Sequence, residues 1–306
     1  MSDQIDGTNA GTVAVPSGAA RLERASPQRS ERKRLLRAFL RQRLGVVGLA
    51  IIVIFALMAI FAGQLAPYDW REQSIQDRFQ NASSEHLLGT DELGRDIFSR
   101  ILYGARYSLV IGVAAVMVSF AVGAAIGMIS GFYPKLDTVI MRLIDVLMAF
   151  PGILLAIAIV AALGPGLRNV IIAIAVNEIP GFARLTRSMV LSLRERDYVL
   201  AARVVGGSDM SIIRRHVLVN LVSPIIVFAS LRISTSILVA ATLSFLGLGI
   251  QPPTPEWGAM VSTARQYLST APHTFFYPTM AIFITVIAFN LLGDALRDVL
   301  DPTLRD

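Results

Sequence analysis

Five long stretches of the chain contain no charged residue, and this pattern constrains the fold more than any other feature. They are 22 to 28 residues long, and a helix that crosses a bilayer core of about 30 Å needs about 20 apolar residues. Over all 306 residues, 54% are hydrophobic and only 16% are charged. The sequence therefore predicts an all-α integral membrane protein. The five stretches are residues 44–66, 107–133, 146–167, 233–255 and 266–293.

A sixth apolar stretch, residues 169–189, is weaker because it contains Glu178, Pro180 and Arg184. The distribution of positive charge favours it as a span. Nine Lys and Arg lie between residues 21 and 43, and seven Arg lie between residues 184 and 215. Positive residues near span ends stay on the cytoplasmic side, and both clusters share that side only if the sixth stretch crosses. We predict six transmembrane helices with the N- and C-termini in the cytoplasm.

Several classes of function are disfavoured by what the chain lacks. It has no Cys, which excludes disulfides, thiolate metal sites and a Cys nucleophile. Neither of its lysines, Lys33 and Lys135, belongs to a phosphate-binding G-x-x-x-x-G-K motif, so any ATP must be hydrolysed by a partner. The net charge of +6 is compatible with nucleic acid binding, but the hydrophobic excess favours a membrane. We expect no catalytic residue, no cofactor or metal bound by this chain, and no nucleic acid partner.

The amino-terminal region is expected to lie outside the membrane interior. No hydrophobic segment opens the chain, so a cleaved signal peptide is not expected. Residues 1–20 are rich in Gly, Ser, Thr and Ala and are predicted to be disordered. In residues 30–44, apolar residues at helical spacing among basic ones predict a helix on the anionic membrane lipid surface. The predicted parts are a tail with a basic interfacial helix (1–43), a first span with an outer loop (44–103), a five-helix core (104–298) and a cytoplasmic tail (299–306).

Small residues form one face of the second predicted span. Ala115, Ser119, Gly123, Gly127 and Gly131 recur at every fourth position. In lipid, small residues allow helices to approach closely. The pattern predicts a tight helix contact, either static or sliding.

Two charges and two prolines fall within predicted spans. Intramembrane charges are costly and often functional, so Glu178 and Arg232 are expected either to pair with each other or to line a water-filled pathway. Pro151 and Pro180 are each expected to interrupt a helix.

The loop at residues 193–217 is predicted to project into the cytoplasm as two short helices, over 198–205 and 210–216. The residues that can start or end them are Asp197 as the first cap, Gly206 and Gly207 in a left-handed turn, and Ser208 or Asp209 as the second cap.

Side chains of this loop suit the groove of a partner protein. Ala201 and Ala202 are small enough to allow close approach. The side chains that can pair with acidic residues at the rim of such a groove are Arg203, Arg214 and Arg215. The alternative is an ordinary solvated loop.

The outer segment at residues 67–106 carries both acidic and basic side chains, which can cross-link by charge-assisted hydrogen bonds. The residues expected to do so are Asp91, Arg95, Asp96 and Arg100. They predict a folded cap that either meets a soluble donor protein or braces itself. A second outer segment, residues 247–258, is rich in Gly and Pro and contains Trp257, which is expected either to gate the pathway or to serve the structure.

The cytoplasmic loop also carries a recognisable motif. It reads YVLAAR at residues 198–203 with Tyr198 first, GGSD at 206–209, and IIRRHVLVN at 212–220. This pattern resembles the coupling loop of ABC importer permeases, which docks on the ATP-hydrolysing subunit in that family. Leu200 and Val219 depart from the family pattern of Glu and Pro, and the loss of the carboxylate at the first position is expected to weaken one contact.

Three further segments strengthen the resemblance. The chain reads HLLGTDELGRDIFSR at residues 86–100, SFLGLG at 244–249 and NLLGDALRDVLDP at 290–302. These segments are similar to signatures of the dipeptide, oligopeptide and nickel permeases, and to the C-type permease of dipeptide and glutathione systems in particular. The signature residues in the outer loop are Gly89, Thr90, Asp91, Gly94, Arg95 and Asp96.

The resemblance implies a type I ABC importer permease fold and a location in the cytoplasmic (inner) membrane of a bacterium. It implies four kinds of association: a homologous second permease, two ATP-binding subunits that hold ATP and Mg, an extracytoplasmic solute-binding protein, and membrane lipid. The expected solute is a dipeptide, an oligopeptide or a glutathione-like peptide. The alternatives are nickel chelates or opines within the same class, an ion-gradient-driven secondary transporter, or a membrane enzyme.

Overall fold

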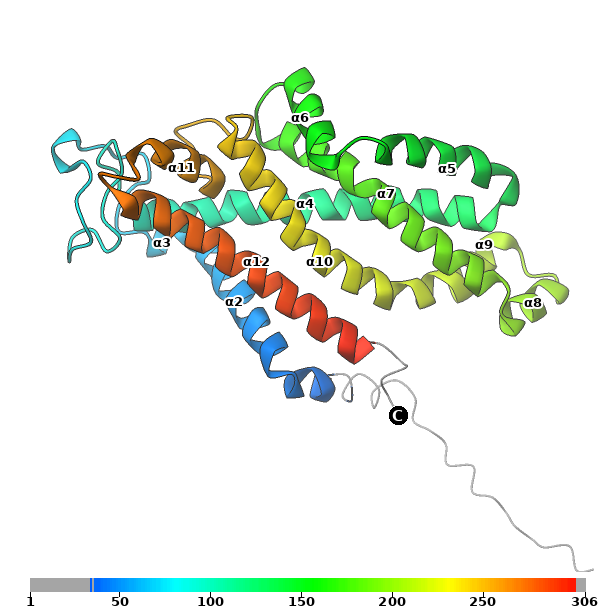
Figure 1. The fold of residues 1–306 in the computed structure, drawn as a ribbon. Coiled ribbons are helices and arrows are strands. Elements are labelled where there is room, and N and C mark those ends of the chain that lie inside the picture. The colour runs from blue at the N-terminus through cyan, green and yellow to red at the C-terminus, as the bar shows by residue number, and fades with distance from the viewer. Residues whose placement is uncertain (1–33, 35, 301–306) are drawn as a thin grey trace, which may run out of the picture.

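Helices account for nearly all regular structure in the computed structural model, which describes residue 34 and residues 36–300 (Figure 1). Within these residues the only β-type pairing is a single bridge between Thr90 and Asp96. The longer helices are α2 (Arg43–Ile60), α4 (Ile97–Phe132), α5 (Pro134–Met148), α6 (Gly152–Leu163), α7 (Leu167–Arg194), α10 (Leu218–Phe245) and α12 (Pro272–Leu300). The short ones are α3 (Ala62–Leu65), η1 (Ile75–Asp77), α8 (Asp197–Val204), α9 (Asp209–Ile212), η2 (Ile213–Val217), α11 (Trp257–Ala264) and η3 (Arg265–Tyr267).

Four of the described helices are long and apolar enough to cross a membrane: α2, α4, the continuous run from α9 to α10, and α12. The bent pair α5 and α6 gives a fifth candidate. Helix α7 is as long as α10, but its charged side chains make it too polar to qualify on composition. The chain is thus an all-helical membrane protein with four or five candidate spans.

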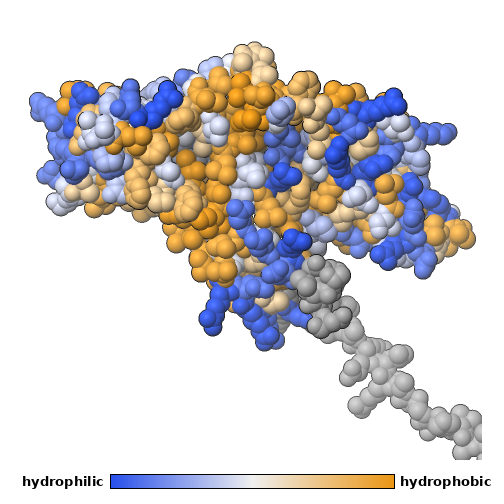
Figure 2. Space-filling view, in the orientation of Figure 1, coloured by the Kyte–Doolittle hydropathy of each residue, from blue (hydrophilic) through white to orange (hydrophobic). Residues whose placement is uncertain are grey.

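The surface has an apolar middle between polar ends (Figure 2). Orange side chains cover the centre of the bundle and the adjoining parts of α2 and α12. Blue side chains gather over the outer loop at one end, around α8 and α9 at the other, and at the ends of α2 and α12 next to the grey trace. This division is the one that a slab of lipid between two aqueous phases favours.

The predicted small-residue face packs α4 against α7. The Ser119 hydroxyl donates to the Ala175 carbonyl at 3.1 Å. A Cβ atom on Gly123 would lie 2.7 Å from the Ile179 carbonyl oxygen. One on Gly127 would collide with the Ala183 carbonyl oxygen, one helical turn further along α7. The two backbones are therefore in direct contact, as the sequence predicts.

The predicted span over residues 146–167 is not one straight helix. The end of α5 and the start of α6 both fall within this stretch, and the two axes meet at 87°. Pro151 lacks an N–H and disfavours the helical conformation at Phe150, so the chain turns there. The interruption expected at Pro151 is thus confirmed, whereas the one expected at Pro180 is wrong, because Pro180 lies inside the uninterrupted helix α7.

Two ion pairs hold α5 along α7. Arg187 makes a bidentate contact with Asp137, with both N–O distances at 2.5 Å, and Arg184 lies 2.6 Å from Asp145. The opposite face of α5 exposes Leu136, Val139, Leu143 and Val146.

The ends of two other spans differ from the predicted limits. Helix α4 begins ten residues before the stretch 107–133, and α10 begins well before the stretch 233–255 and ends at Phe245, where Gly247 has a φ of +78°. The charge-free stretch marks the part of a chain that lipid can cover, whereas hydrogen bonding sets the helix ends.

The predicted interfacial helix is described only in part. Residues 36–41 are helical, and Gln42 separates them from α2. The expected disorder of residues 1–20 and most of the predicted cytoplasmic tail lie outside the described residues.

Candidate functional site

Helix α8 leaves the end of α7 and is fixed to the bundle by one buried side chain. Val199 is fully buried in a cluster with Val190, Phe132 and Val217. The helix begins after Arg196, so Asp197 is its first residue and not its cap, which corrects the predicted cap.

The turn after α8 has the predicted left-handed residue. Gly206 has a φ of +85°, and the Gly207 amide donates to the Ala202 carbonyl at 2.9 Å, the bond that defines a Schellman ending. At Gly207 the requirement is different, because a Cβ there would lie 2.7 Å from the same carbonyl oxygen.

The second short helix is not separate from the membrane helix that follows. Ser208 occupies the N-cap position without a side-chain hydrogen bond, and Asp209 opens α9. The chain then passes through the π-helical η2 directly into α10. The prediction of a free helix over 210–216 is wrong because no breaker separates these residues from the span.

The surface formed by α8, the turn and α9, which we call the docking surface, exposes large apolar side chains. Val204 and Val205 are each 87% exposed, and Met210 is 71% exposed. Contiguous apolar exposure of this kind marks contact sites. These three residues were not among those predicted to dock, although two adjacent valines before a glycine pair are an unusual sequence for a solvated turn.

Charged side chains surround these apolar residues. In the described part of the chain, no ion pair involves Asp197, Arg203, Asp209, Arg214 or Arg215. The Arg203 guanidinium lies 5.7 Å from the Phe132 ring. The predicted docking residues all lie in exposed or half-buried positions of residues 197–215, a segment that extends from α8 into η2. The remaining ones are Tyr198, whose ring lies 5.8 Å from that of His216, and Ala201 and Ala202.

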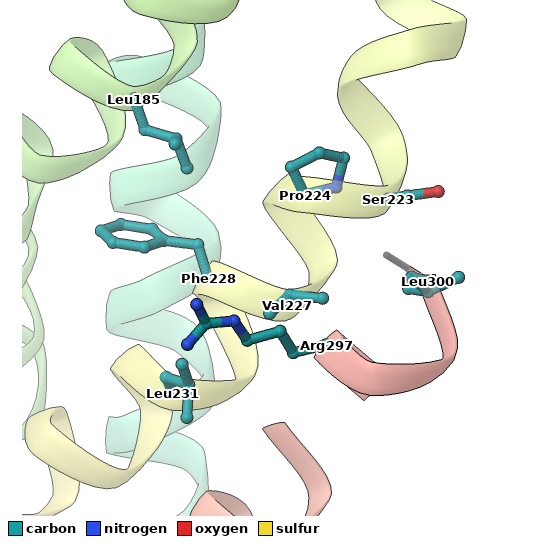
Figure 3. Close-up of a pocket in the computed structure, with 8 residues that line it drawn as sticks. All are labelled: Leu185, Ser223, Pro224, Val227, Phe228, Leu231, Arg297 and Leu300. Atoms are coloured by element: carbon teal, nitrogen blue, oxygen red, sulfur yellow. The ribbon is translucent and has the colours of Figure 1, made fainter. Parts of the chain in front are cut away.

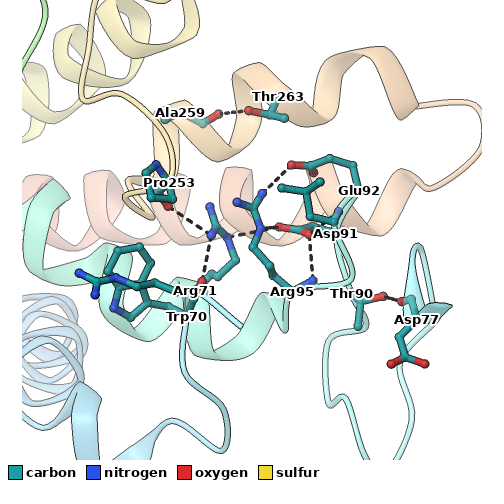
Figure 4. Close-up of polar contacts among 12 residues, drawn as sticks. Trp70, Arg71, Asp77, Thr90, Asp91, Glu92, Arg95, Pro253, Ala259 and Thr263 are labelled. Atoms are coloured by element: carbon teal, nitrogen blue, oxygen red, sulfur yellow. Dashed lines mark hydrogen bonds and ion pairs between the residues drawn. The ribbon is translucent and has the colours of Figure 1, made fainter. Parts of the chain in front are cut away.

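At the other end of the bundle, the outer loop is organised around Asp91 (Figure 4). Its carboxylate accepts from the Arg95 Nε at 2.6 Å and lies 3.4 Å from the Arg100 Nε. Arg95 also reaches Glu92 at 2.5 Å. Burial and the neighbouring Asp91 charge raise the pKa of Glu92 above its usual value, in spite of that contact. The predicted charge cross-links are confirmed for Asp91, Arg95 and Arg100.

Asp96 has a different partner from the one expected. It caps α4 by accepting from the Ser99 amide at 2.7 Å, and it lies 3.0 Å from His86 Nδ1. Next to it, the Thr90 carbonyl lies 3.1 Å from His273 Nε2 at the start of α12. The turns that make these contacts possible use Gly89 and Gly94, both with positive φ.

Trp257 lies in the core of the described bundle. It is fully buried, its indole N–H donates to the Ile101 carbonyl at 3.0 Å, and its ring packs edge-on against Phe55. The adjacent Glu256 caps α11 and accepts from Ser108 at 3.2 Å.

Glu178 and Arg232 face each other from α7 and α10. Arg232 Nε lies 3.4 Å from Glu178 Oε2, which confirms that the two can pair. They line a pocket of about 250 Å³ beside the bend between α5 and α6.

A larger cavity of about 530 Å³ lies between α7, α10 and α12. Its walls are apolar apart from Ser223 and Arg297, and the Arg297 side chain extends from α12 toward Phe228 and Leu231 (Figure 3).

The bundle has exposed apolar and charged side chains at one end and a cross-linked loop at the other. A comparison by sequence shows which family has this chain as a member. Residues 123–306 match the family described as the binding-protein-dependent transport system inner membrane component. The chain belongs to this family. Residues 30–83 match the N-terminal TM domain of oligopeptide transport permease C. The protein is thus an ABC importer permease, a non-catalytic, multi-pass subunit of the inner membrane, and the alternatives of a secondary transporter and a membrane enzyme are set aside.

Relatives of this permease support the assignment. It is 51% identical to the glutathione transport system permease protein GsiD of Pectobacterium atrosepticum over 88% of this chain and 90% of the relative. It is 52% identical to the protein of the same name from Escherichia coli O6:K15:H31 over 88% and 89%. Family membership implies ATP-hydrolysing and binding-protein partners, with ATP bound by the former.

Solved structures confirm the ABC permease fold. The permease is similar to chains of the inward-facing MetNI methionine ABC transporter in two crystal forms, with TM-scores of 0.53 and 0.54. The identity is 19% in both, over 65% and 64% of this chain and 96% and 94% of the solved ones.

Proposed function

We propose that this permease carries glutathione or other short peptides into the cell as one of two homologous permeases in a complex. The observation that carries the proposal is the identity of about one residue in two with glutathione permeases over nearly their whole length. The complex would also contain two ATP-binding subunits, which hold ATP and Mg, and an extracytoplasmic solute-binding protein.

The proposed topology has six spans with both termini in the cytoplasm. It counts α5 and α6 as one broken span and α7 as a polar one. Two observations support it: the outer loop and α11 lie at one end of the bundle, whereas α8 and α9 lie at the other (Figure 1). The arginines of α8 and of the turns next to it lie on the second side, and the preference of positive residues for the cytoplasm supports the assignment of that side to the cytoplasm.

In this proposal, the docking surface contacts an ATP-binding subunit. Closure of the ATPase pair on ATP would move α8 and α9, and the pathway would switch between outward and inward states by differential binding. The contact residues would be Asp197, Tyr198, Ala201, Ala202, Arg203, Gly206, Ser208, Asp209, Arg214 and Arg215. Two observations support this role: the surface exposes large apolar side chains, and its charged side chains have no ion pair among the described residues.

The cap formed by Gly89, Thr90, Asp91, Gly94, Arg95 and Asp96 would receive the solute-binding protein. Its internal cross-links support a rigid receiving surface on the outer side.

The test is uptake by the purified complex in liposomes, with ATP enclosed and the binding protein outside. Labelled glutathione and labelled dipeptides should accumulate only with hydrolysable ATP. Accumulation of a nickel chelate or an opine in place of both peptides would refute the assigned solute and leave the importer class intact.

A further inference from the structure

The ion pair between α7 and α10 is poorly satisfied for a pair inside a membrane. Glu178 is 5% exposed, yet its single contact with Arg232 is 3.4 Å long and uses Nε alone. In the described residues neither side chain has a hydrogen bond, and the Arg232 guanidinium otherwise lies 4.6 Å from the Phe228 ring. By contrast, the Asp137–Arg187 pair is bidentate. The terminal nitrogens of Arg232 are therefore available to another acceptor.

The pair lies deep in the bundle. Glu178 and Arg232 are each near the middle of a 28-residue helix, and such a helix is about 42 Å long. Charges at this depth are expensive, so they face a protein interior or a water-filled cavity and mark pathways.

The adjoining pocket has the chemistry of a peptide subsite. It is bordered by the last residues of α5 and the first residues of α6, where helix ends leave backbone carbonyls and amides without helical partners. Its volume of about 250 Å³ is just below the range of complete ligand sites, about 300–1,000 Å³. Exposed Met148 and Phe150 lie at its rim, so the pocket opens on the surface of this chain, where a second permease could complete it.

We propose that Arg232 and Glu178 form a charged subsite on the translocation pathway, which contacts the ends of a peptide in transit. The Arg232 guanidinium takes the solute carboxylate in a bidentate contact, and Glu178 takes the solute ammonium. One ion pair is exchanged for two, so no uncompensated charge arises. The weak resting pair keeps this exchange easily reversible. This inference rests on the proposed function, because it requires a zwitterionic solute.

The test uses the whole complex in liposomes with two solutes: glutathione and glutathione with its glycine carboxylate amidated. Both are supplied at binding-protein saturation, confirmed by direct titration. R232Q should lower the glutathione transport rate by about tenfold or more, the loss expected when a hydrogen bond to a charged group is removed. The amidated solute should lose less than about threefold. R232K, which keeps a charge but not the planar fork, should lie between.

Two further variants separate contact with solute from structural damage. E178Q/R232Q leaves no unpaired buried charge, so it should assemble even where R232Q does not, and it should show the same discrimination between solutes. D145N/R184Q removes an exposed ion pair from α7 and should leave both rates unchanged.

Equal losses for the two solutes, with subunits missing from the purified complex, would show that the pair holds the second permease, and would overturn the proposal. Undiminished glutathione transport by E178Q/R232Q would also overturn it. If the wild-type complex moves no glutathione, the proposed solute fails separately. The same variants are then compared with a dipeptide and its amide, and an equal response to both would refute the subsite.

Discussion

Replacement of Gly206 by Val tests the docking surface at its turn. The backbone there has a φ of +85°, and a Cβ would meet no heavy atom within 4 Å. The cost is therefore conformational and not steric. A left-handed conformation costs an L-residue about 1–2 kcal/mol, which lowers the population of the native turn by about 5- to 30-fold.

The expected result is loss of coupling. Because the turn sets the angle between α8 and α9, G206V should lower the amount of solute moved per ATP hydrolysed by about 5- to 30-fold. Basal hydrolysis by the ATP-binding subunits should remain. Uptake and phosphate release are measured on the same liposomes, and the copurified ATP-binding subunits are quantified on gels.

Two controls isolate the cause. Gly164 has a φ of +89° and equally open space around it, but it lies in the turn between α6 and α7. G164V therefore carries the same strain away from the docking surface and should stay coupled. G206N should also stay coupled, because Asn tolerates positive φ better than other residues. Normal coupling in G206V, or equal uncoupling in G164V, would refute the assigned role of the turn.

Three other changes act on stability and can be read by thermal unfolding in detergent. D91N weakens the hydrogen bond from Arg95 and the ion pair with Arg100, and it should destabilise the outer cap by about 1.5–3 kcal/mol. G127L should cost about 1–3 kcal/mol of stability by overpacking, since its Cβ would collide with the Ala183 carbonyl oxygen. G63A is the control and should be neutral, because its Cβ would meet only the Tyr103 hydroxyl oxygen, at 3.5 Å. Because the folded pKa of Glu92 lies above 4.5, stability should fall as pH rises from about 4.5 through that pKa, and E92Q should flatten this dependence.

The sequence predicted the helices of this permease well because lipid imposes a simple rule. Without water, backbone groups must bond within the chain, so each charge-free stretch corresponds to a helix or a helix pair. The limits of α4 and α10 could not be read in this way, because those helices continue beyond the apolar stretch.

The two prolines show where local rules stop. Pro151 and Pro180 are the same residue type in apolar surroundings, yet only Pro151 ends a helix. At Pro180, the flanking residues of α7 are packed on the glycines of α4: Gly123 lies against the Ile179 carbonyl. That tertiary contact holds α7 in a helix on both sides of the proline. The helix propensities of single residues therefore could not predict it.

The candidate site residues also divide into those whose contacts the sequence could predict and those whose contacts it could not. The links among Asp91, Arg95 and Arg100 in the outer cap could be predicted from sequence because these residues lie within ten residues of one another. The role of Trp257 could not, because its partners Phe55 and Ile101 are distant in the chain. The exposed Val204 and Val205 were missed because apolar residues are assigned to a core by default.

The continuity of α9, η2 and α10 links the two proposed sites. The run Asp209–Phe245 is one span of 37 residues, so the docking surface and Arg232 share a single helix, about 30 Å apart along its axis. Its one irregular part is the π-helical turn Ile213–Val217, and π turns of this kind often occur at functional sites. Buried Ile213 and Val217 tie that turn to the core. A displacement of the docking surface would therefore reach the Glu178–Arg232 pair along α10, whereas a separate second helix, as first expected, would have absorbed the motion before it entered the membrane.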